Sequence, residues 1–417
     1  MRELFGKFGF LVIDVIRGTS VVKVFTELLK FQFLDKSKLN KLSQTSLDEL
    51  VKKSQNIPFY KSYASFDEYP ILTKKIVREK YDSFFNPFIS KKERVRKKTG
   101  GSTGEPFVYY TGKESQSYLW AGILLAWNAA GWIWGEKVVF LAGSSIFGKG
   151  WKLKIYYALM NVKVFDSFDM NQKLMKACLS YIEKHNVQFL YGYAFSLYEL
   201  AKFNENNAKQ VSVKSVISTA ENLTESMRKK IENSFSCEVF NQYGCNDGGV
   251  SAFECEVHDG FHYISTRAYV ESIDGRLVST DMKNEVMPLL RYDTGDRVVL
   301  SDRLCACGRG FPIIQEISGR SNDVVFNTET NAMVHSEFFN HLFRENQSIS
   351  SYQVVIEDRN VRINLVTEES IDLEAIRIKY GNAIRGKIGA YNITFLSNHI
   401  LEHLKNGKHQ TIVNKNI

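Results

Sequence analysis

The sequence predicts an α/β protein with a large N-terminal domain of parallel sheets covered by helices, a barrel-like β subdomain, and a small C-terminal α+β domain. Strand-like segments alternate with helix-like segments between residues 107 and 240, a pattern typical of parallel sheets with helices on both faces. The apolar period shortens to two from Gly260 to Leu300, which predicts antiparallel or barrel-like pairing. The chain has 417 residues, more than the roughly 250–300 of one hydrophobic core, so we expect two domains.

The N-terminal segment is predicted to be helical from about Ser37 to Asp82, with a stop near Pro58, because leucines recur there at helical spacing. An apolar run from Phe8 to Ile16 comes before it. No small-residue cleavage site of the signal-peptide kind follows that run, so we interpret it as mature, cytoplasmic sequence. A peripheral association through this run stays open.

The alternating segments follow in order along the chain. We expect strands at residues 107–110, 137–141, 163–165, 189–191, 213–219 and 239–240, and helices at residues 115–134, 170–185, 196–204 and 224–235. The uncharged stretch Tyr118–Gly135 approaches the length of a membrane span. Its Asn128 and its glycines suit a buried helix better, and we favour that interpretation.

The character of the sequence changes after Gly319 and Arg320. The last part predicts strands at residues 324–326, 352–356 and 361–366, and helices at residues 335–344 and 372–384. We therefore divide the chain into a large domain, residues 1–320, and a small mobile domain, residues 321–417, with a hinge at Ser321–Asp323.

The charge balance favours anionic ligands. Lys and Arg number 54 against 46 Asp and Glu, a net charge of +8, which suits nucleotides without requiring a nucleic acid, and we expect none as a partner. The densest basic run, residues 91–98, lies just before a glycine-rich segment. It could draw a polyphosphate towards that segment, although a solvated helix end explains the individual lysines equally well.

The glycine-rich segment is a candidate phosphate loop. Its glycines let backbone N–H groups surround an anion, and its hydroxyls add donors to phosphate oxygens. The spacing is not that of a Walker A motif, and alone such a segment is more often an ordinary turn. The residues concerned are Thr99, Gly100, Gly101, Ser102, Thr103 and Gly104.

A group of cysteines with a histidine predicts a metal site. Cys255, His262, Cys305 and Cys307 offer three thiolates and one imidazole, a set suited to a closed, structural Zn²⁺ site. The alternative is three buried reduced cysteines and a surface histidine, and His258 competes as a ligand. The other three cysteines look like lone reduced thiols, which is consistent with the cytoplasm.

Further segments, in order, resemble the motifs of the adenylate-forming superfamily of acyl-CoA synthetases, adenylation domains and luciferases. The loop at residues 99–106 resembles its phosphate-binding motif. The other segments are Asn241–Asp247, Arg291–Asp296, Gly319–Arg320 and Asn406–Lys408.

The resemblance implies a role for several residues. Tyr243 would stack on adenine beside Gly244 and Asn246, and Asp247 would hold Mg²⁺. Asp296 would bind both ribose hydroxyls, Arg320 would lead into the hinge, and Lys408 would reach the α-phosphate of ATP. Ala220 and Glu221 would lie near the adenine, although the turn that they end is also a common helix cap.

Within the superfamily the sequence most resembles phenylacetate–CoA ligases and capsule-biosynthesis (coenzyme F390 synthetase-like) proteins. The marks are Glu254 and Cys255 followed by Gly260 and His262, and the segment Cys305–Arg309. Some of these relatives carry a metal at the matching positions, and His262 fits them better than His258.

The resemblance implies an ATP-dependent, AMP-forming ligase that activates a carboxylic acid as its acyl-adenylate. The acceptor would be the thiol of CoA or an amine, and the pathway would be surface polysaccharide biosynthesis, with a peripheral association to a polysaccharide-assembly complex. The alternative is a non-catalytic nucleotide-binding partner of that assembly. Glu105, Asn246 and Asp247, which depart from the usual motif residues, favour the alternative, whereas Asp296, Arg320 and Lys408 favour the enzyme.

Overall fold

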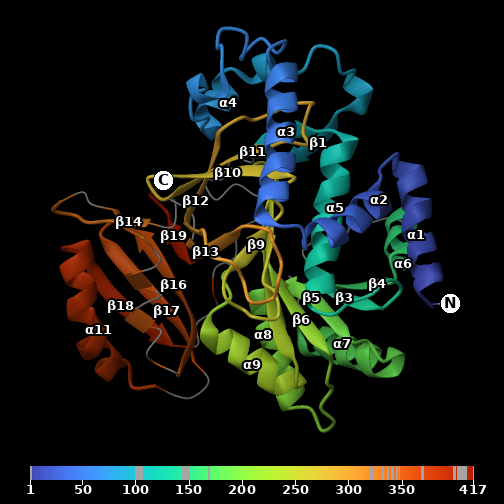
Figure 1. Ribbon diagram of the computed structural model, residues 1–417. Helices are drawn as coiled ribbons and strands as arrows, with labels where there is room; N and C mark the ends of the chain where they lie inside the picture. Colours follow the sequence, from blue (N-terminus) through green and yellow to red (C-terminus); the bar gives the residue numbers. More distant parts are fainter. Residues whose placement is uncertain are drawn as a thin grey trace.

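The computed structural model describes most of the chain (Figure 1). The described residues are 2–98, 107–142, 151–167, 170–318, 324–330, 333–335, 338–339, 342–343, 346, 348–367, 371–397, 401 and 411–416. An 11-stranded mixed sheet forms the centre, with the strand order β10-β11-β12-β13-β9-β8-β7-β6-β5-β3-β4.

One half of this sheet is parallel, as the alternating pattern predicts. Its strands are β3 (Val138–Ala142), β4 (Val162–Asp166), β5 (Phe189–Tyr193), β6 (Ser215–Thr219) and β7 (Glu238–Cys245). Between them lie α6 (Trp151–Leu159), α7 (Gln172–His185), α8 (Ala194–Glu205) and α9 (Glu225–Phe235). The Asn171 and Thr224 side chains cap α7 and α9 by accepting N–H groups of the first turn.

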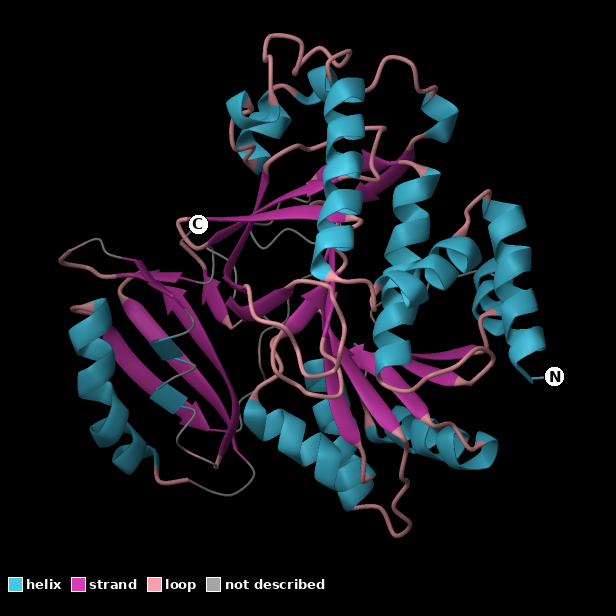
Figure 2. Cartoon of the chain, in the orientation of Figure 1, coloured by secondary structure: helices cyan, strands magenta, loops and turns pink. Residues whose placement is uncertain are grey.

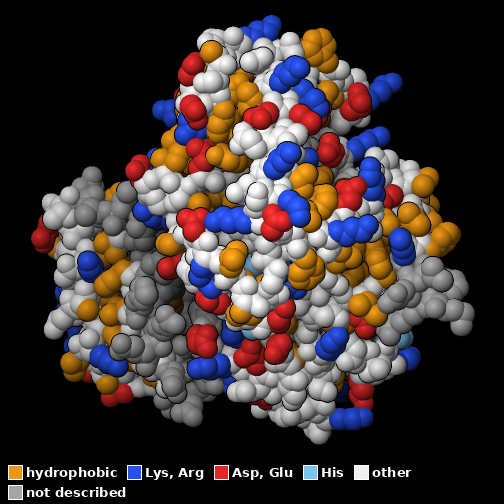
Figure 3. All heavy atoms as spheres, in the orientation of Figure 1, with side chains coloured by type: hydrophobic (Ala, Val, Ile, Leu, Met, Phe, Trp, Pro, Cys, Tyr) orange, Lys and Arg blue, Asp and Glu red, His pale blue; other side chains and the backbone are white. Residues whose placement is uncertain are grey.

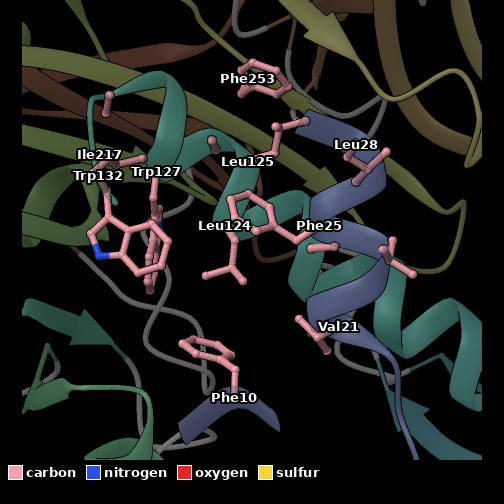
Figure 4. Close-up of a cluster of buried hydrophobic side chains, with 14 of the residues drawn as sticks. Phe10, Val21, Phe25, Leu28, Leu124, Leu125, Trp127, Trp132, Ile217 and Phe253 are labelled. Atoms are coloured by element: carbon pink, nitrogen blue, oxygen red, sulfur yellow. The ribbon is translucent and has the colours of Figure 1, made fainter. Parts of the chain in front are cut away.

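Alternate residues of the parallel strands face two separate cores. On one face, Phe140, Ile217 and Phe240 pack against α5 (Lys113–Ala129), whose Trp127 is fully buried (Figure 4). On the other face, apolar residues of the same strands pack against α7, α8 and α9. The predicted layering, with helices on both faces, is confirmed, and the stretch from Tyr118 is a core helix.

The other half of the sheet is antiparallel, as the period of two predicts. It contains β8 (Val250–Phe253), β9 (Phe261–Tyr263), β13 (Ile313–Ser318), β12 (Tyr292–Ser301), β11 (Arg276–Asp281) and β10 (Ala268–Ile273). These strands do not form a sheet of their own, as the predicted barrel-like subdomain would require. Because β8 pairs with β7, they continue the parallel half (Figure 2).

The N-terminal region adds helices that the sequence analysis did not foresee. The helices α1 (Arg2–Arg17) and α2 (Val21–Phe31) come before α3 (Lys36–Ser54), and Phe10, Val21 and Phe25 complete the core over α5 (Figure 4). Shorter helices follow, η1 (Phe66–Glu68), α4 (Lys74–Glu79), η2 (Tyr81–Phe84) and η3 (Lys91–Glu93), and then the hairpin of β1 (Val95–Lys98) and β2 (Val108–Thr111). No helix in the described part of the chain is long and apolar enough to cross a membrane.

The C-terminal part carries a small sheet in the order β18-β17-β16-β19. Its elements are β16 (Ile349–Glu357), β17 (Asn360–Thr367), α11 (Leu373–Ile388), β18 (Asn392–Ser397) and β19 (Ile412–Asn414), and β14 (Val324–Phe326) pairs with β15 (Met333–His335). The predicted helix at residues 335–344 is helical at its described residues 338, 339, 342 and 343. Residues 319–323 lie outside the described part, and the division into domains stays a prediction.

Candidate active site and metal centre

The carboxyl ends of the parallel strands meet at one edge of the sheet. Tyr193 of β5 pairs with Thr219 of β6, which pairs with Gln242 of β7. Ligands of open α/β sheets bind outside this edge. Among the described residues, the side-chain oxygens of Ser218 and Gln242 are buried here without a hydrogen-bond partner.

Tyr243 and Asp296 are brought together from two halves of the sheet. The Tyr243 hydroxyl donates a 2.5 Å hydrogen bond to Oδ2 of Asp296, on β12. Gly244 beside it is exposed, and a Cβ built there would meet no atom within 4 Å. The residues predicted to bind adenine and ribose are therefore in contact at one surface, where Tyr243 is half-buried and Asp296 is 9% exposed.

Asp247 lies behind this surface, with 8% of its area exposed. Its Oδ2 accepts a hydrogen bond from the Tyr292 hydroxyl at 2.8 Å, and its Oδ1 accepts one from Sγ of Cys245 at 3.2 Å. Burial, followed by the charge of Asp247, raises the pKa of Tyr292 well above its ordinary value. The phenol thus stays protonated and keeps donating to the carboxylate.

Ala220 and Glu221 follow β6 at the same edge. Ala220 adopts the left-handed region with φ +65°, which is uncommon for a residue other than glycine. Oε2 of Glu221 accepts the backbone N–H of Phe195 at 3.0 Å, in the first turn of α8. The helix that follows this turn, α9, is instead capped by Thr224. Asn246, next to Cys245 at the end of β7, is exposed.

Several predicted site residues lie outside the described part of the chain. They are Thr99, Gly100, Gly101, Ser102, Thr103 and Gly104 of the phosphate loop, the hinge residue Arg320, and Lys408. Their roles stay predictions from the motifs.

The four predicted metal ligands lie together. Their ligand atoms are all within 4.8 Å of one another, with Cys255 Sγ 3.6 Å from Cys305 Sγ and Cys307 Sγ 3.3 Å from Nε2 of His262. Atoms bound at about 2.0–2.3 Å to a tetrahedral zinc ion lie roughly 3.3–3.8 Å apart. The competing His258 instead contacts Glu254, with 3.3 Å between Nδ1 and Oε2.

Local structure around the cluster fixes the ligands. Cys255 follows β8, His262 lies on β9, and Cys305 and Cys307 belong to the loop between β12 and β13. Nδ1 of His262 lies 2.9 Å from the Phe311 carbonyl oxygen, which leaves Nε2 facing the thiols. The loop turns at Gly308, whose φ is +79° and whose N–H donates to the Cys305 carbonyl.

The sequence analysis missed two contacts in this region. Tyr292 belonged to a recognised motif but had no assigned role, and a polar residue inside a motif was its only signal. Arg228 of α9 donates two 2.8 Å hydrogen bonds to Glu254, and no local pattern indicated this pair. Trp127 and Tyr191 pack against each other in the core at 5.5 Å between ring centroids.

Comparisons with known proteins agree with this architecture. No family model matches the chain. The chain is 27% identical to Protein CapK of Staphylococcus aureus over 347 residues, which cover 80% of this chain and 76% of CapK. It is 25% identical to the phenylacetate–coenzyme A ligase of Thermus thermophilus over 328 residues, 71% of this chain and 73% of that protein.

Solved structures show the same fold. The 2-hydroxyisobutyryl-CoA ligase with a bound acyl-adenylate superposes with a TM-score of 0.67 at 16% identity, over 91% of this chain and 89% of that one. The chain resembles the superfamily of adenylate-forming ligases in sequence and in fold. The amide bond synthetase McbA from Marinactinospora thermotolerans gives a TM-score of 0.53 at 14% identity, over 76% of this chain and 68% of that one.

This resemblance confirms two predictions. The mixed α/β fold, with a large sheet and a small C-terminal sheet, is the fold of this superfamily. The predicted enzyme class, an AMP-forming acid ligase of the CoA-ligase or amide-synthetase type, is also confirmed.

Proposed function

We propose that this adenylate-forming ligase binds ATP at the carboxyl edge of the sheet and activates a carboxylic acid there. The observation that carries the proposal is the contact between Tyr243 and Asp296 beside the exposed Gly244. The tyrosine ring offers a stacking face for adenine. The Asp296 carboxylate would accept hydrogen bonds from the ribose hydroxyls.

Activation exchanges a poor leaving group for a good one. A carboxylate oxygen attacks the α-phosphorus of ATP, the bond to pyrophosphate breaks, and the acyl-adenylate forms. The protein contributes chiefly alignment and charge neutralisation. In the proposed arrangement Lys408 and the loop at residues 99–106 supply the positive charge and the N–H donors.

Asp247 is the residue that would hold Mg²⁺, which neutralises phosphate charge. Each of its oxygens accepts one hydrogen bond, and a carboxylate oxygen can accept two. A magnesium ion therefore fits one remaining lone pair, either directly or through a water molecule.

The second half-reaction transfers the acyl group from AMP to an acceptor. The thiol of CoA or an amine attacks the acyl carbon, and AMP leaves. Likeness to a phenylacetate–coenzyme A ligase supports CoA as the acceptor, whereas likeness in fold to an amide bond synthetase is compatible with an amine acceptor. Likeness to CapK supports a place in surface polysaccharide biosynthesis.

We also propose a structural zinc ion at Cys255, His262, Cys305 and Cys307. The 3.6 and 3.3 Å separations fit a tetrahedral ion with four protein ligands and no open position. Such an ion would tie the ends of β8 and β9 to the β12–β13 loop.

ATP–pyrophosphate exchange with a panel of carboxylic acids tests the proposed function. Acid-dependent exchange is expected for an enzyme. Binding of ATP without exchange for any acid would favour the alternative of a non-catalytic nucleotide-binding partner in polysaccharide assembly.

A further inference from the structure

A second concave site lies between α1, α2, β1, α5 and α6. It is a cavity of about 230 Å³, and Arg17, Lys92, Lys113, Trp120 and Tyr156 are among its lining residues. Neither Tyr243 nor Asp296 lines it. The described lining of the cavity therefore shares no residue with the contact between Tyr243 and Asp296.

Three cations reach this cavity from three different elements. Arg17 ends α1, Lys92 lies in η3, and Lys113 begins α5. In the part of the chain that the structure describes, none of the three forms a salt bridge. The carboxylate that lines the cavity, Glu93, is engaged with Ser90, whose hydroxyl and N–H donate to Oε2 at 2.7 and 3.2 Å.

Neighbouring groups leave an excess of positive charge. The hydrogen bonds from Ser90, and to a smaller degree the charge of Lys113, lower the pKa of Glu93, so this carboxylate offsets only part of it. Lys97 lies on the same side of β1 as Val95, which lines the cavity, and burial, followed by the charge of Arg17, lowers its pKa. The buried Asp14 is also engaged, because it accepts hydrogen bonds from Thr19 and from the first N–H groups of α2 at 2.7–3.0 Å. Four cations, Arg17, Lys92, Lys97 and Lys113, outnumber the two carboxylates of Glu93 and Asp14, so the excess positive charge would stabilise an external anion here.

Two aromatic rings line the cavity beside Arg17. The Trp120 and Tyr156 rings meet edge to face with 6.1 Å between centroids. Nη1 of Arg17 donates to the Tyr156 hydroxyl at 3.1 Å, and the guanidinium carbon lies 5.2 Å from the ring centroid. The contact orients Arg17 and leaves its other N–H groups for a ligand.

We propose that this cavity binds a phosphate ester, with the phosphate among Arg17, Lys92 and Lys113 and the organic part against Trp120 and Tyr156. Guanidinium and ammonium groups are the usual protein partners of phosphate oxygens. The proposal does not depend on the proposed function, because it uses none of the residues assigned to ATP.

A soluble phosphate ester and a lipid headgroup both present this chemistry. The outer face of α1 favours a lipid headgroup, because its apolar side chains Phe8 and Val15 are 62% and 84% exposed and could contact a membrane surface. Hydrophobic side chains with Lys and Arg nearby mark that edge of the surface in Figure 3. Such a mixture suits the boundary between headgroups and acyl chains.

Calorimetry on the full chain with phenyl phosphate tests the site, with saturating ATP present to occupy the nucleotide surface. Arg17→Gln and Lys113→Gln should each weaken binding about tenfold or more, as for the loss of a hydrogen bond to a charged group. Lys23→Gln, which changes an exposed lysine of α2 outside the lining, should leave the affinity unchanged. Lys92→Gln repeats the test if another variant lowers the melting temperature.

Cosedimentation with phosphatidylglycerol vesicles, compared with phosphatidylcholine vesicles, distinguishes the two sources. Binding to the anionic vesicles that Arg17→Gln abolishes would assign a lipid headgroup. Binding of phenyl phosphate alone would assign a soluble ester. The proposal is overturned if neither probe binds, if ATP displaces phenyl phosphate, or if the variants bind as the wild type does.

Discussion

The Tyr292 hydroxyl donates a hydrogen bond of 2.8 Å to Oδ2 of Asp247. The two residues belong to different motifs, 45 positions apart, and the bond joins the end of the β7 segment to β12. It holds in place the carboxylate that we assign to Mg²⁺. The raised pKa of Tyr292 keeps the phenol a donor at neutral pH.

Removing this donor should destabilise the fold. Tyr292→Phe leaves a buried carboxylate oxygen without its partner, which should lower the free energy of unfolding by about 1–3 kcal/mol. Urea denaturation measures the change. Tyr69→Phe is the matched control in the same core cluster, because its buried hydroxyl has no partner among the described residues. Equal costs for the two variants would contradict the assigned bond.

Asp296→Ala should weaken ATP binding. The variant loses hydrogen bonds between a charged group and the ribose hydroxyls, which corresponds to about 1.5–3 kcal/mol of binding free energy. Calorimetric titration with ATP measures the loss. Asp274→Ala, at a site with 84% of its side chain exposed, serves as the control. Unchanged affinity in Asp296→Ala would mean that the nucleotide binds elsewhere.

The purified protein should contain about one zinc ion per chain, as expected for a closed four-ligand site. Cys305→Ser should lose the metal and melt at a lower temperature, because metal binding contributes to folding free energy. Cys237→Ala changes a cysteine outside the cluster and should keep the metal. Full stability after complete removal of zinc by a chelator would refute a structural role.

Local sequence patterns predicted individual helices and strands better than they predicted which strands pair with one another. The predicted helix from Met170 to His185 matches α7, because both of its signals, the capping Asn171 and the helical spacing of apolar residues, lie within the segment itself. The α1 helix was missed although its residues have a helical amphipathic period, because the apolar run from Phe8 to Ile16 was interpreted only as a possible targeting or anchoring segment. The position of β13 between β12 and β9 depends on pairing between distant segments, which no local period encodes.

The same distinction between local and long-range information applies to the candidate sites. The metal cluster was predictable because its ligands are rare residue types in short spacings. The contact of Tyr292 with Asp247 was not, because both residues are common and only the folded sheet brings them together. The phosphate loop, Arg320 and Lys408 were identified by motif alone, and their roles stay predictions.

The central claim is that this chain forms acyl-adenylates, and the most direct test is ATP–pyrophosphate exchange in the wild type and in Lys408→Ala. The wild type should exchange in the presence of a cognate acid and Mg²⁺. Lys408→Ala should lose exchange while it still transfers the acyl group from a prepared acyl-adenylate, because the lysine would act on the phosphate only in the first step. Exchange at the wild-type rate in Lys408→Ala would contradict the role of this lysine, and no exchange by the wild type with any acid would contradict the claim itself.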